Sequence, residues 1–363
     1  MKCLSLLLPG ARGFAAVLSL FLLVSPAVAQ STSTGKSSGP VPGQAATGGL
    51  SLANCSGHEA MTQAFKANFT EKLRAWASRE MSDVKYKKVF YPFSGPDAGT
   101  VVSLFPDAEY YLLVADQIPE FNLIGKSLVC KGEQCERERD LREAECATVA
   151  FYARSGFYLT NQLNGVNAPR PRFLKMLAYN FGLLGAEIES VARVLVTADG
   201  EIRLDPNKGF KETQGVRFTV RLKEGRQIVV DYLSVDLSNR GLRRRPNVAK
   251  AFSKNLTDVV FIKAASHLPQ RPDFSDLVGL MQTVRPSVIL QDETGMSINL
   301  LKDKRVITQY GKFVSGHRLW INEKANLDLA AYFKANPAEK TLPFRIGYEK
   351  AGGSMLLLAR QQR

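Results

Sequence analysis

The stretch KKVFYPFSGPDAGTVVSLFPDAEYYLLVAD, which runs from Lys87 to Asp116, decides the fold class. Its apolar run at 89–93 predicts a strand that is buried on both faces. A turn follows, Ser-Gly-Pro-Asp, because Gly95 permits a positive φ and the proline and aspartate suit the start of a helix. A short helix and a second apolar strand at 110–114 come next. Strand, turn, helix and strand in this order open a parallel α/β sheet.

Later segments continue this pattern. Apolar runs at 258–262 and 287–290 predict two more buried strands, and the periodicity of 273–284 predicts a helix between them. Between about 186 and 238 apolar and polar residues alternate, which predicts antiparallel strands joined by a hairpin turn. Further strands are expected at 305–311, 344–348 and 354–359. The sequence therefore predicts an α/β fold: a Rossmann-like, mostly parallel sheet flanked by helices, with an inserted antiparallel hairpin region.

The N-terminal residues have the composition of an export signal and a linker. Lys2 and Arg12 accompany an apolar run at 14–24, and Ala27-Val28-Ala29 is a small-x-small cleavage site. We expect a signal peptide at 1–29, a flexible Ser/Thr/Gly/Pro linker at 30–50, and a single α/β domain at 51–363 that contains the antiparallel excursion. The alternative is an uncleaved N-terminal anchor. The signal looks bacterial, so we expect a periplasmic or extracellular protein with no transmembrane helix after cleavage.

The charge of the chain bears on its partners. The formal net charge is +14, and removal of residues 1–29 takes away two cations and leaves +12. Such a balance favours an anionic envelope ligand, although dispersed charge also serves solubility alone. Arg243, Arg244 and Arg245 are the centre of the densest basic cluster and are candidate anion-binding residues; the alternative is a solvated loop. No nucleic acid is expected as a partner, because no aromatic residues interleave with these arginines.

Four cysteines follow the signal: Cys55, Cys130, Cys135 and Cys146. Export favours disulfides, and four cysteines allow three pairings. Cys135 and Cys146 fall on one predicted helix, where eleven residues correspond to about 16 Å of rise. A disulfide tolerates only ~4.4–6.8 Å between Cα atoms. We therefore expect Cys130–Cys135 and Cys55–Cys146; a metal site is the alternative, but no pair has zinc-ligand spacing.

Three segments resemble Rossmann-fold methyltransferases. They are the first strand with its SGPD turn, FPDAEYYLLVAD at 105–116, and the block from 257 to 293. The resemblance implies a cofactor loop at Gly95 and Asp97 and a ribose-binding Asp116, for which a strand-end cap is the alternative. The loop departs from the family, since the turn has one glycine and Pro92 and Phe93 replace an acid and small residues. Exported compartments do not supply S-adenosylmethionine, so the cofactor is left open.

Four short sequence motifs are similar to motifs of a group of exported bacterial proteins of unknown function. They are YPFSGPD (91–97), QDETGM (291–296), YGKF (310–313) and LPFRIGY (342–348). The resemblance covers much of the chain after the signal. It implies no activity.

Ligands of open α/β sheets bind beyond the carboxyl ends of the strands. That rule gathers polar residues on one edge: Ser94, Asp97, Asp116, Ser266, His267, Asp292, Glu293 and Thr294. His267 is the candidate general base, with Asp292 or Asp97 to orient it and Ser94 or Ser266 as the nucleophile. The alternative is that these residues cap helices and satisfy turn backbone.

A divalent cation is a weaker hypothesis for the same edge. Its oxygen and imidazole ligands would be Asp97, Asp116, Asp292, Glu293 and His267. No stretch has the spacing of a metal loop, so no metal site is predicted.

Two functions remain. The first is a non-catalytic exported protein that binds a small molecule or an envelope ligand in a degenerate Rossmann-like pocket. The second is an enzyme at the same edge, either a hydrolase that uses His267 or a divergent methyltransferase-like transferase.

Overall fold

The computed structural model describes residues 50–116, 119–124, 132–158, 163, 169, 171–205, 214–255, 257–313, 327–338, 340–347 and 354–362. One ten-stranded sheet within these ranges contains β1 (Lys88–Pro92), β2 (Tyr110–Ala115), β3 (Glu187–Val196), β4 (Ile202–Leu204), β5 (Gly215–Arg221), β6 (Gln227–Ser234), β7 (Val259–Ile262), β8 (Val288–Gln291), β9 (Arg305–Gly311) and β10 (Met355–Gln361). The helices are α1 (His58–Phe65), α2 (Glu71–Glu80), α3 (Ala98–Leu104), α4 (Glu133–Ser155), α6 (Phe173–Leu183), α7 (Asn239–Arg244), α8 (Pro246–Asn255), α9 (Ser275–Val284) and α10 (Leu327–Ala335). Among these described helices, none has both the length and the apolar character that a membrane crossing requires.

The sheet is mixed rather than mostly parallel. Its strand order is β4-β3-β5-β6-β2-β1-β7-β8-β10-β9. Among the described strands, the four pairs from β6 to β8 are parallel and the other five pairs are antiparallel. An α/β fold is therefore present, but the prediction of a mostly parallel sheet is not confirmed. The antiparallel hairpin predicted within 186–238 is present, since the tight turn from Leu222 to Arg226 joins β5 to β6. The antiparallel pairs of β10 with β8 and β9 were not predicted.

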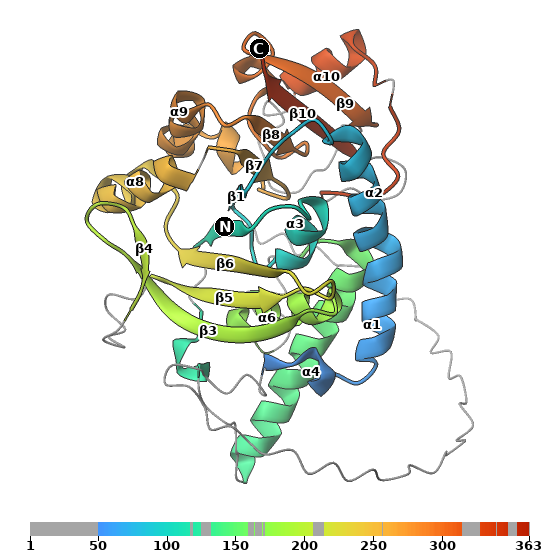
Figure 1. Cartoon of the computed structure of the whole chain (residues 1–363), viewed down its shortest axis with the longest axis vertical. Helices are drawn as coiled ribbons and strands as arrows, with labels where there is room; N and C mark the ends of the chain where they lie inside the picture. The colour runs from blue at the N-terminus through green and yellow to red at the C-terminus, as the bar shows by residue number, and fades with distance from the viewer. Residues whose placement is uncertain are drawn as a thin grey trace, which may run out of the picture. The chain divides into compact units, whose positions relative to one another are not determined.

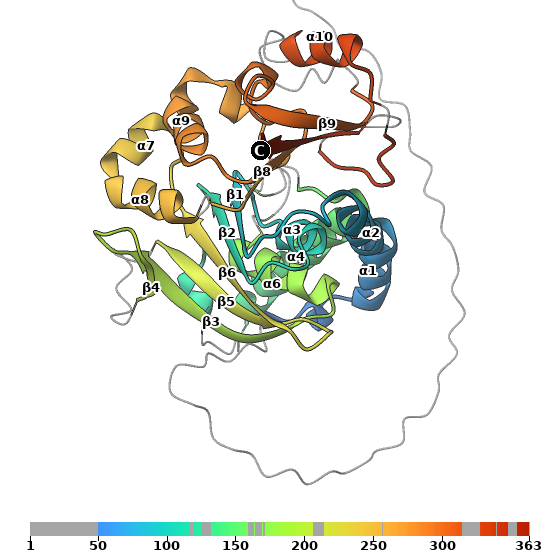
Figure 2. The ribbon, with the colours of Figure 1, turned by 45° about the horizontal axis from the view of Figure 1, so that its top comes forward.

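Helices cover both faces of the sheet (Figures 1 and 2). On one face the strands pack against α1, α2, α3, α4 and α6, and on the other against α7, α8 and α9. Successive residues of β1 serve opposite faces, since Val89 and Tyr91 belong to the first cluster and Phe90 to the second. Burial on both faces explains why these strands are continuous apolar runs in the sequence.

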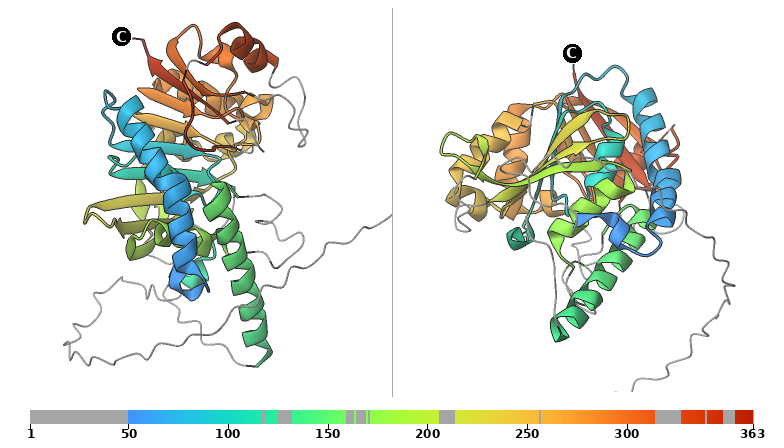
Figure 3. Two further views of the ribbon diagram at one scale, coloured as in Figure 1. Left: turned by 90° about the vertical axis from the view of Figure 1, so that its right-hand side faces the viewer. Right: turned by 60° about the horizontal axis from the view of Figure 1, so that its bottom comes forward.

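The amphipathic pattern at 58–81 forms α1 and α2, joined by a π-helical turn at Lys66–Thr70. Figure 3 shows this helical column beside α4. Phe65, Phe69, Leu73 and Trp76 are all buried, so this apolar stripe packs into the core.

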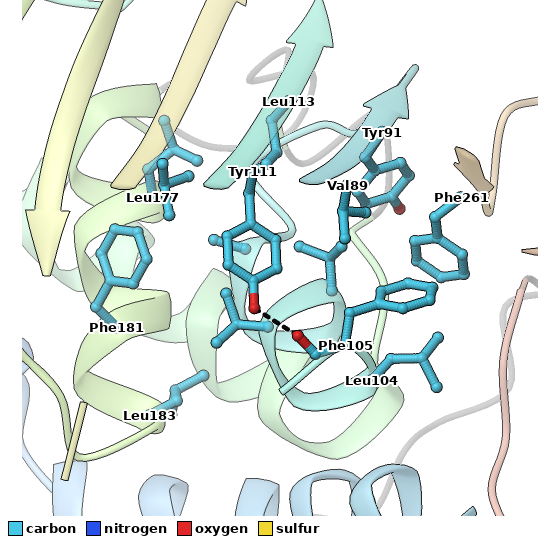
Figure 4. Close-up of a cluster of buried hydrophobic side chains, with 14 of the residues drawn as sticks. Val89, Tyr91, Leu104, Phe105, Tyr111, Leu113, Leu177, Phe181, Leu183 and Phe261 are labelled. Atoms are coloured by element: carbon cyan, nitrogen blue, oxygen red, sulfur yellow. Dashed lines mark hydrogen bonds between the residues drawn. The ribbon is translucent and has the colours of Figure 1, made fainter. Parts of the chain in front are cut away.

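Aromatic side chains fill the first face around β1, β2 and α3 (Figure 4). Tyr111 of β2 is fully buried, and its hydroxyl donates a hydrogen bond of 2.6 Å to the carbonyl of Phe105, just past α3. Tyr91 of β1 packs on Phe261 of β7, with ring centroids 4.8 Å apart. The first contact joins β2 to the end of α3, and the second joins β1 to β7 near their carboxyl ends.

The prediction of a strand at 344–348 is wrong for residues 344–347, which the structure describes. Residues 344–347 are not in a strand, and Gly347 has a φ of 77°. The Ile346 amide donates to the hydroxyl of Ser354 at 2.7 Å instead of to a neighbouring strand. The apolar residues Phe344 and Ile346 are buried all the same, which explains the misleading pattern.

A disulfide joins Cys55 to Cys146, as predicted. Their Cα atoms are 5.5 Å apart, and the bridge links the N-terminal segment to α4. Cys135 lies on α4 as well, which explains why it cannot pair with Cys146. Cys135 is disulfide-bonded, but its predicted partner Cys130 lies outside the described residues.

Glu80, at the end of α2, connects this helix to β9, the edge strand of the sheet. Its carboxylate accepts hydrogen bonds of 2.7 Å from Tyr310 of β9, from Lys340 and from Arg79. Burial alone would raise the pKa of Glu80, but the hydrogen bonds from Lys340, Arg79 and Tyr310 outweigh it and lower the pKa from 4.5 to about 2. The ionised form is therefore favoured by folding.

This carboxylate makes stability depend on pH. A carboxyl whose pKa is lower in the folded state contributes its full stability above its unfolded pKa and loses it as the pH falls through the folded value. Acid titration from pH 5 to pH 2 is therefore expected to remove the Glu80 contribution. At pH 7 the variant E80Q should lower the free energy of unfolding by about 1–3 kcal/mol in urea unfolding, and the loss should shrink toward pH 2.

The matched control is E71Q on the same helix, whose carboxylate is 62% exposed and lies 3.4 Å from Lys66. An exposed pair of this type contributes up to about 1 kcal/mol at most. Equal effects of E80Q and E71Q would contradict the role assigned to Glu80.

Candidate functional site

A cavity of about 360 Å³ lies at the carboxyl ends of four parallel strands. Its lining comes from residues 93–95 and 97 after β1, 115–116 at the end of β2, 235–237 after β6 and 263–266 after β7. In the sheet, β2 and β6 lie on one side of β1 and β7 lies on the other. The cavity is therefore at the point where the strand order reverses, which is where open α/β sheets bind ligands.

The loops on the two sides of this point have strained backbone. Phe93 follows β1 with a φ of 60°, and Ala264, Ser266 and His267 follow β7 with φ values of 51°, 51° and 56°. In the described part of the chain, these are four of the five non-glycine residues with positive φ. Each such residue costs about 1–3 kcal/mol, and this strain is concentrated at ligand sites in proteins generally.

Asp97 and Lys263 form a buried ion pair at the cavity. Asp97 caps α3, where its Oδ1 accepts from the Thr100 amide at 3.4 Å, and Lys263 is the first residue after β7. The Lys263 ammonium donates to Oδ2 of Asp97, and each residue is only 2% exposed. An isolated charge at this depth would cost several kcal/mol, so each of these two groups needs the other as its partner.

Two tyrosine hydroxyls complete the surroundings of the Asp97 carboxylate. Tyr152 of α4 donates to Oδ1, and Tyr91 of β1 donates to Oδ2 at 3.2 Å. Tyr91 and Lys263 thus share one carboxylate oxygen. Burial, reinforced by the negative charge of Asp97, raises the pKa of Tyr152 well above its usual value, so this hydroxyl keeps its proton.

A second layer of polar contacts fixes the turn before α3. The amide of Gly99 donates to Asn180 Oδ1 at 2.9 Å, and Asn180 Nδ2 donates to the Tyr158 hydroxyl at 2.7 Å. The Tyr158 ring stacks on Tyr152 with centroids 4.4 Å apart. A Cβ atom at Gly99 would lie 2.9 Å from Asn180 Oδ1, so this position requires glycine.

Two exposed carboxylates stand at the rim. Asp116 follows β2 and Asp236 lies two residues after β6, the neighbouring strand. Burial and the negative charge of Asp236 raise the pKa of Asp116, and the positive charge of Arg245 opposes the shift. At the rim the negative charge of Asp236 therefore disfavours the ionised form of Asp116.

The remaining walls are apolar. Phe93 meets Phe274 edge to face, with ring centroids 5.5 Å apart, and Leu237, Ala265 and Leu268 add aliphatic surface. Apolar walls with a few convergent polar groups are the usual form of a small-molecule site.

The structure divides the residues that the strand-end rule selected. Ser94, Gly95, Asp97, Asp116 and Ser266 line the cavity, whereas the described lining does not include His267, Asp292, Glu293 or Thr294. The Ser94 hydroxyl donates to the Gly95 carbonyl at 3.0 Å. His267 is buried and precedes a 3₁₀ helix, Leu268–Gln270. Its role as a general base stays a prediction, with no support from the cavity lining.

Asp292 holds the loop after β7. It is fully buried, and its carboxylate accepts from the amides of Ala264 at 2.7 Å and Thr294 at 2.9 Å. The Thr294 hydroxyl in turn accepts from the Ala265 amide at 2.7 Å. Burial raises the pKa of Asp292 despite these hydrogen bonds. The geometry assigns Asp292 to positioning of the strained loop.

The structure gives no support at the cavity for the two ion-binding hypotheses, a divalent cation and an anion bound by arginines. The described residues contain no group of three or more His, Cys, Asp or Glu residues placed to hold a metal ion. Arg243, Arg244 and Arg245 are exposed, and Arg243 Nε pairs with Asp276 Oδ2 at 3.0 Å. Anion binding by these arginines stays a prediction.

Four residues of the site escaped the sequence analysis: Lys263, Tyr91, Tyr152 and Asp236. Lys263 directly follows a predicted strand, so the strand-end rule that selected Asp116 also applies to it. Asp236 lay within the region predicted as an antiparallel excursion, to which that rule was not applied. Tyr91 lay within the buried run of β1. Tyr152 is on α4, and no sequence pattern indicated that this helix reaches the cavity.

Removal of the Asp97 charge tests the buried pair. D97N is expected to lower the free energy of unfolding by about 3–5 kcal/mol at pH 7, because Lys263 keeps a buried charge without a counter-ion. Asparagine caps helices as well as aspartate does, so the cap of α3 is retained. The double variant D97N/K263M removes both charges and should regain most of the loss in urea unfolding. A cost below about 1 kcal/mol for D97N would show that the pair is not a stability requirement.

Comparisons with known proteins assign no family to the chain. No protein-family model, curated protein or solved structure matches it. The proposals that follow therefore depend on the cavity and on the resemblances in the sequence.

Proposed function

We propose that the protein is an exported binding protein that holds a small organic molecule in the cavity at the carboxyl ends of β1, β2, β6 and β7. The observation that carries this proposal is the buried Lys263–Asp97 pair beside the cavity. Apolar residues of similar volume stabilise a protein as well as a buried ion pair does. An ion pair that borders a cavity is therefore better explained by ligand recognition than by a contribution to stability.

The form of the cavity supports the same proposal. Its volume of about 360 Å³ suits a small molecule. Phe93, Phe274 and Leu237 offer apolar contacts, while Lys263, Tyr91 and Asp116 offer polar contacts at separate points. Such a combination binds an apolar body and orients its polar groups.

A divergent methyltransferase-like transferase is the second candidate, and the strand order favours it. The strands β6-β2-β1-β7-β8 correspond to the 3-2-1-4-5 order of doubly wound folds. Of these, β1, β2, β7 and β8 are the strands in which the sequence resembles Rossmann-fold methyltransferases, and beyond β8 the sheet continues with the antiparallel strand β10 and the edge strand β9. Asp116 lines the cavity where the family has its ribose ligand. We rank this candidate second for two reasons. The turn after β1 has only one glycine, and the buried Lys263–Asp97 pair beside the cavity supports the first proposal.

Thermal unfolding with a ligand panel tests the first proposal. The panel contains aromatic alcohols and aldehydes, envelope saccharides, nucleotides and S-adenosylmethionine. A true ligand at 100 times its Kd should add about 2.7 kcal/mol to the free energy of unfolding. L268W, which narrows the cavity, should abolish the shift, whereas V306W on the exposed edge strand β9 should keep it.

The panel also separates the two candidates. Stabilisation by S-adenosylmethionine alone, with at least about tenfold weaker binding in D116N, would favour the transferase. Stabilisation by other compounds of the panel, with none by S-adenosylmethionine, would favour the binding protein. A panel without any shift, or equal shifts in wild type and L268W, would count against binding in this cavity.

Export to the periplasm or the cell exterior is the second part of the proposal. It is supported by the signal-like residues 1–29, which lie outside the described residues, and by the Cys55–Cys146 disulfide, which suits an oxidising compartment. N-terminal sequencing after bacterial expression should begin at Gln30, and alkylation without reductant should label neither Cys55 nor Cys146. A29K, which blocks the small-x-small site, should retain Met1. A wild-type chain that starts at Met1 with both thiols free would contradict export.

A further inference from the structure

We infer that Lys263 forms a reversible imine with a carbonyl compound, an aldehyde or a ketone, bound in the cavity. The inference rests on the proposed function, because it names the chemical class of ligand for the same cavity.

Lys263 has the position that an imine-forming lysine needs. It is the one lysine among the described residues that line the cavity, and its side chain is only 2% exposed. Lysines that react with carbonyl compounds in proteins lie in desolvated, apolar pockets of this kind. The apolar side chains of Phe93 and Phe274 bring the body of a carbonyl compound next to this amine.

Asp97 can serve the lysine in two ways. Its Oδ2 accepts directly from the Lys263 ammonium, so it is the immediate acceptor for the proton that the amine must release. The product is an iminium, which carries the same single positive charge as the ammonium. Asp97 therefore remains its counter-ion, and the buried pair of charges is conserved from reactant to product.

Tyr91 supplies the third group. Its hydroxyl donates to the same Oδ2 atom at 3.2 Å, which places a proton donor beside the amine. Tyr91 also lines the cavity, whereas Tyr152 holds the other oxygen of Asp97 and is not among the lining residues. Tyr91 is thus the residue that can protonate the carbonyl oxygen as nitrogen attacks carbon.

The reaction balances with these groups alone. The ammonium passes one proton to Asp97, and the neutral amine attacks the carbonyl carbon to form a C–N bond. The carbonyl oxygen gains two protons in all, both derived from the lysine nitrogen and relayed through Asp97 and Tyr91. The C–O bond then breaks and water leaves. Ammonium and aldehyde have become iminium and water, with no oxidant or reductant consumed.

Reductive trapping tests the inference on the purified full chain. The probe is 2-naphthaldehyde with cyanoborohydride at pH 7, and peptide mass mapping measures the rate at each lysine. We expect Lys263 to gain the naphthylmethyl group at least about tenfold faster than Lys302, an exposed lysine outside the cavity, because the cavity holds the aldehyde near the amine. In Y91F the rate at Lys263 should fall by at least about tenfold, and the rate at Lys302 should not change.

A compound that binds but cannot react separates binding in the cavity from imine formation. The alcohol 2-naphthylmethanol has the same body but cannot form an imine, and it should raise the thermal midpoint of the wild-type protein. K263R keeps the cation beside Asp97 and should give no adduct at this position.

Two results would overturn the inference. Labelling of Lys263 no faster than Lys302 while the alcohol still stabilises the protein would remove the imine and leave the binding proposal intact. Absence of both preferential labelling and stabilisation by the alcohol would remove the imine, and the ligand panel would then decide on binding separately. Fast labelling that Y91F leaves unchanged would remove Tyr91 from the reaction.

Discussion

One carboxylate, that of Asp97, holds together the elements that meet at the cavity. It caps α3 through Thr100, accepts from Tyr91 of β1 and Tyr152 of α4, and pairs with Lys263 at the end of β7. Four donors for one buried carboxylate offset its loss of hydration, which a single partner would not. Any displacement of β1, α3, α4 or β7 would break at least one of these bonds, so the carboxylate constrains all four at once.

The two-sided core makes that constraint effective. β1 and β7 are buried on both faces, so their carboxyl ends cannot shift without disturbing the packing on either side of the sheet. Asp292 and Thr294 then hold the loop after β7 in a conformation that Ala264 and Ser266 would not adopt by themselves. Lys263 lies between the rigid strand and this held loop, and its ammonium is consequently kept at one point of the cavity.

The sequence predicted those parts of the fold that depend on burial. β1, β2, β7 and β8 are apolar on both faces, and this pattern leaves few alternatives. The mostly parallel sheet was not confirmed, because strand direction depends on connections, and the antiparallel pairing of β10 with β8 and β9 is invisible to periodicity. In the site, Asp97 and Asp116 followed from the strand-end rule. Tyr152 could not be predicted in this way, because the contact between α4 and the turn after β1 is set by tertiary packing.

Net charge is a poor guide to what this cavity binds. The chain as a whole is strongly basic, with +14. The cavity has the opposite balance, because Lys263 is neutralised by Asp97 while Asp116 and Asp236 add two carboxylates at the rim. A polyanion drawn to the basic surface would meet repulsion at this rim. In the proposed function, attraction of an envelope partner and selection of a small molecule would therefore be separate properties. The first would depend on the basic surface, and the second on the few groups around Asp97.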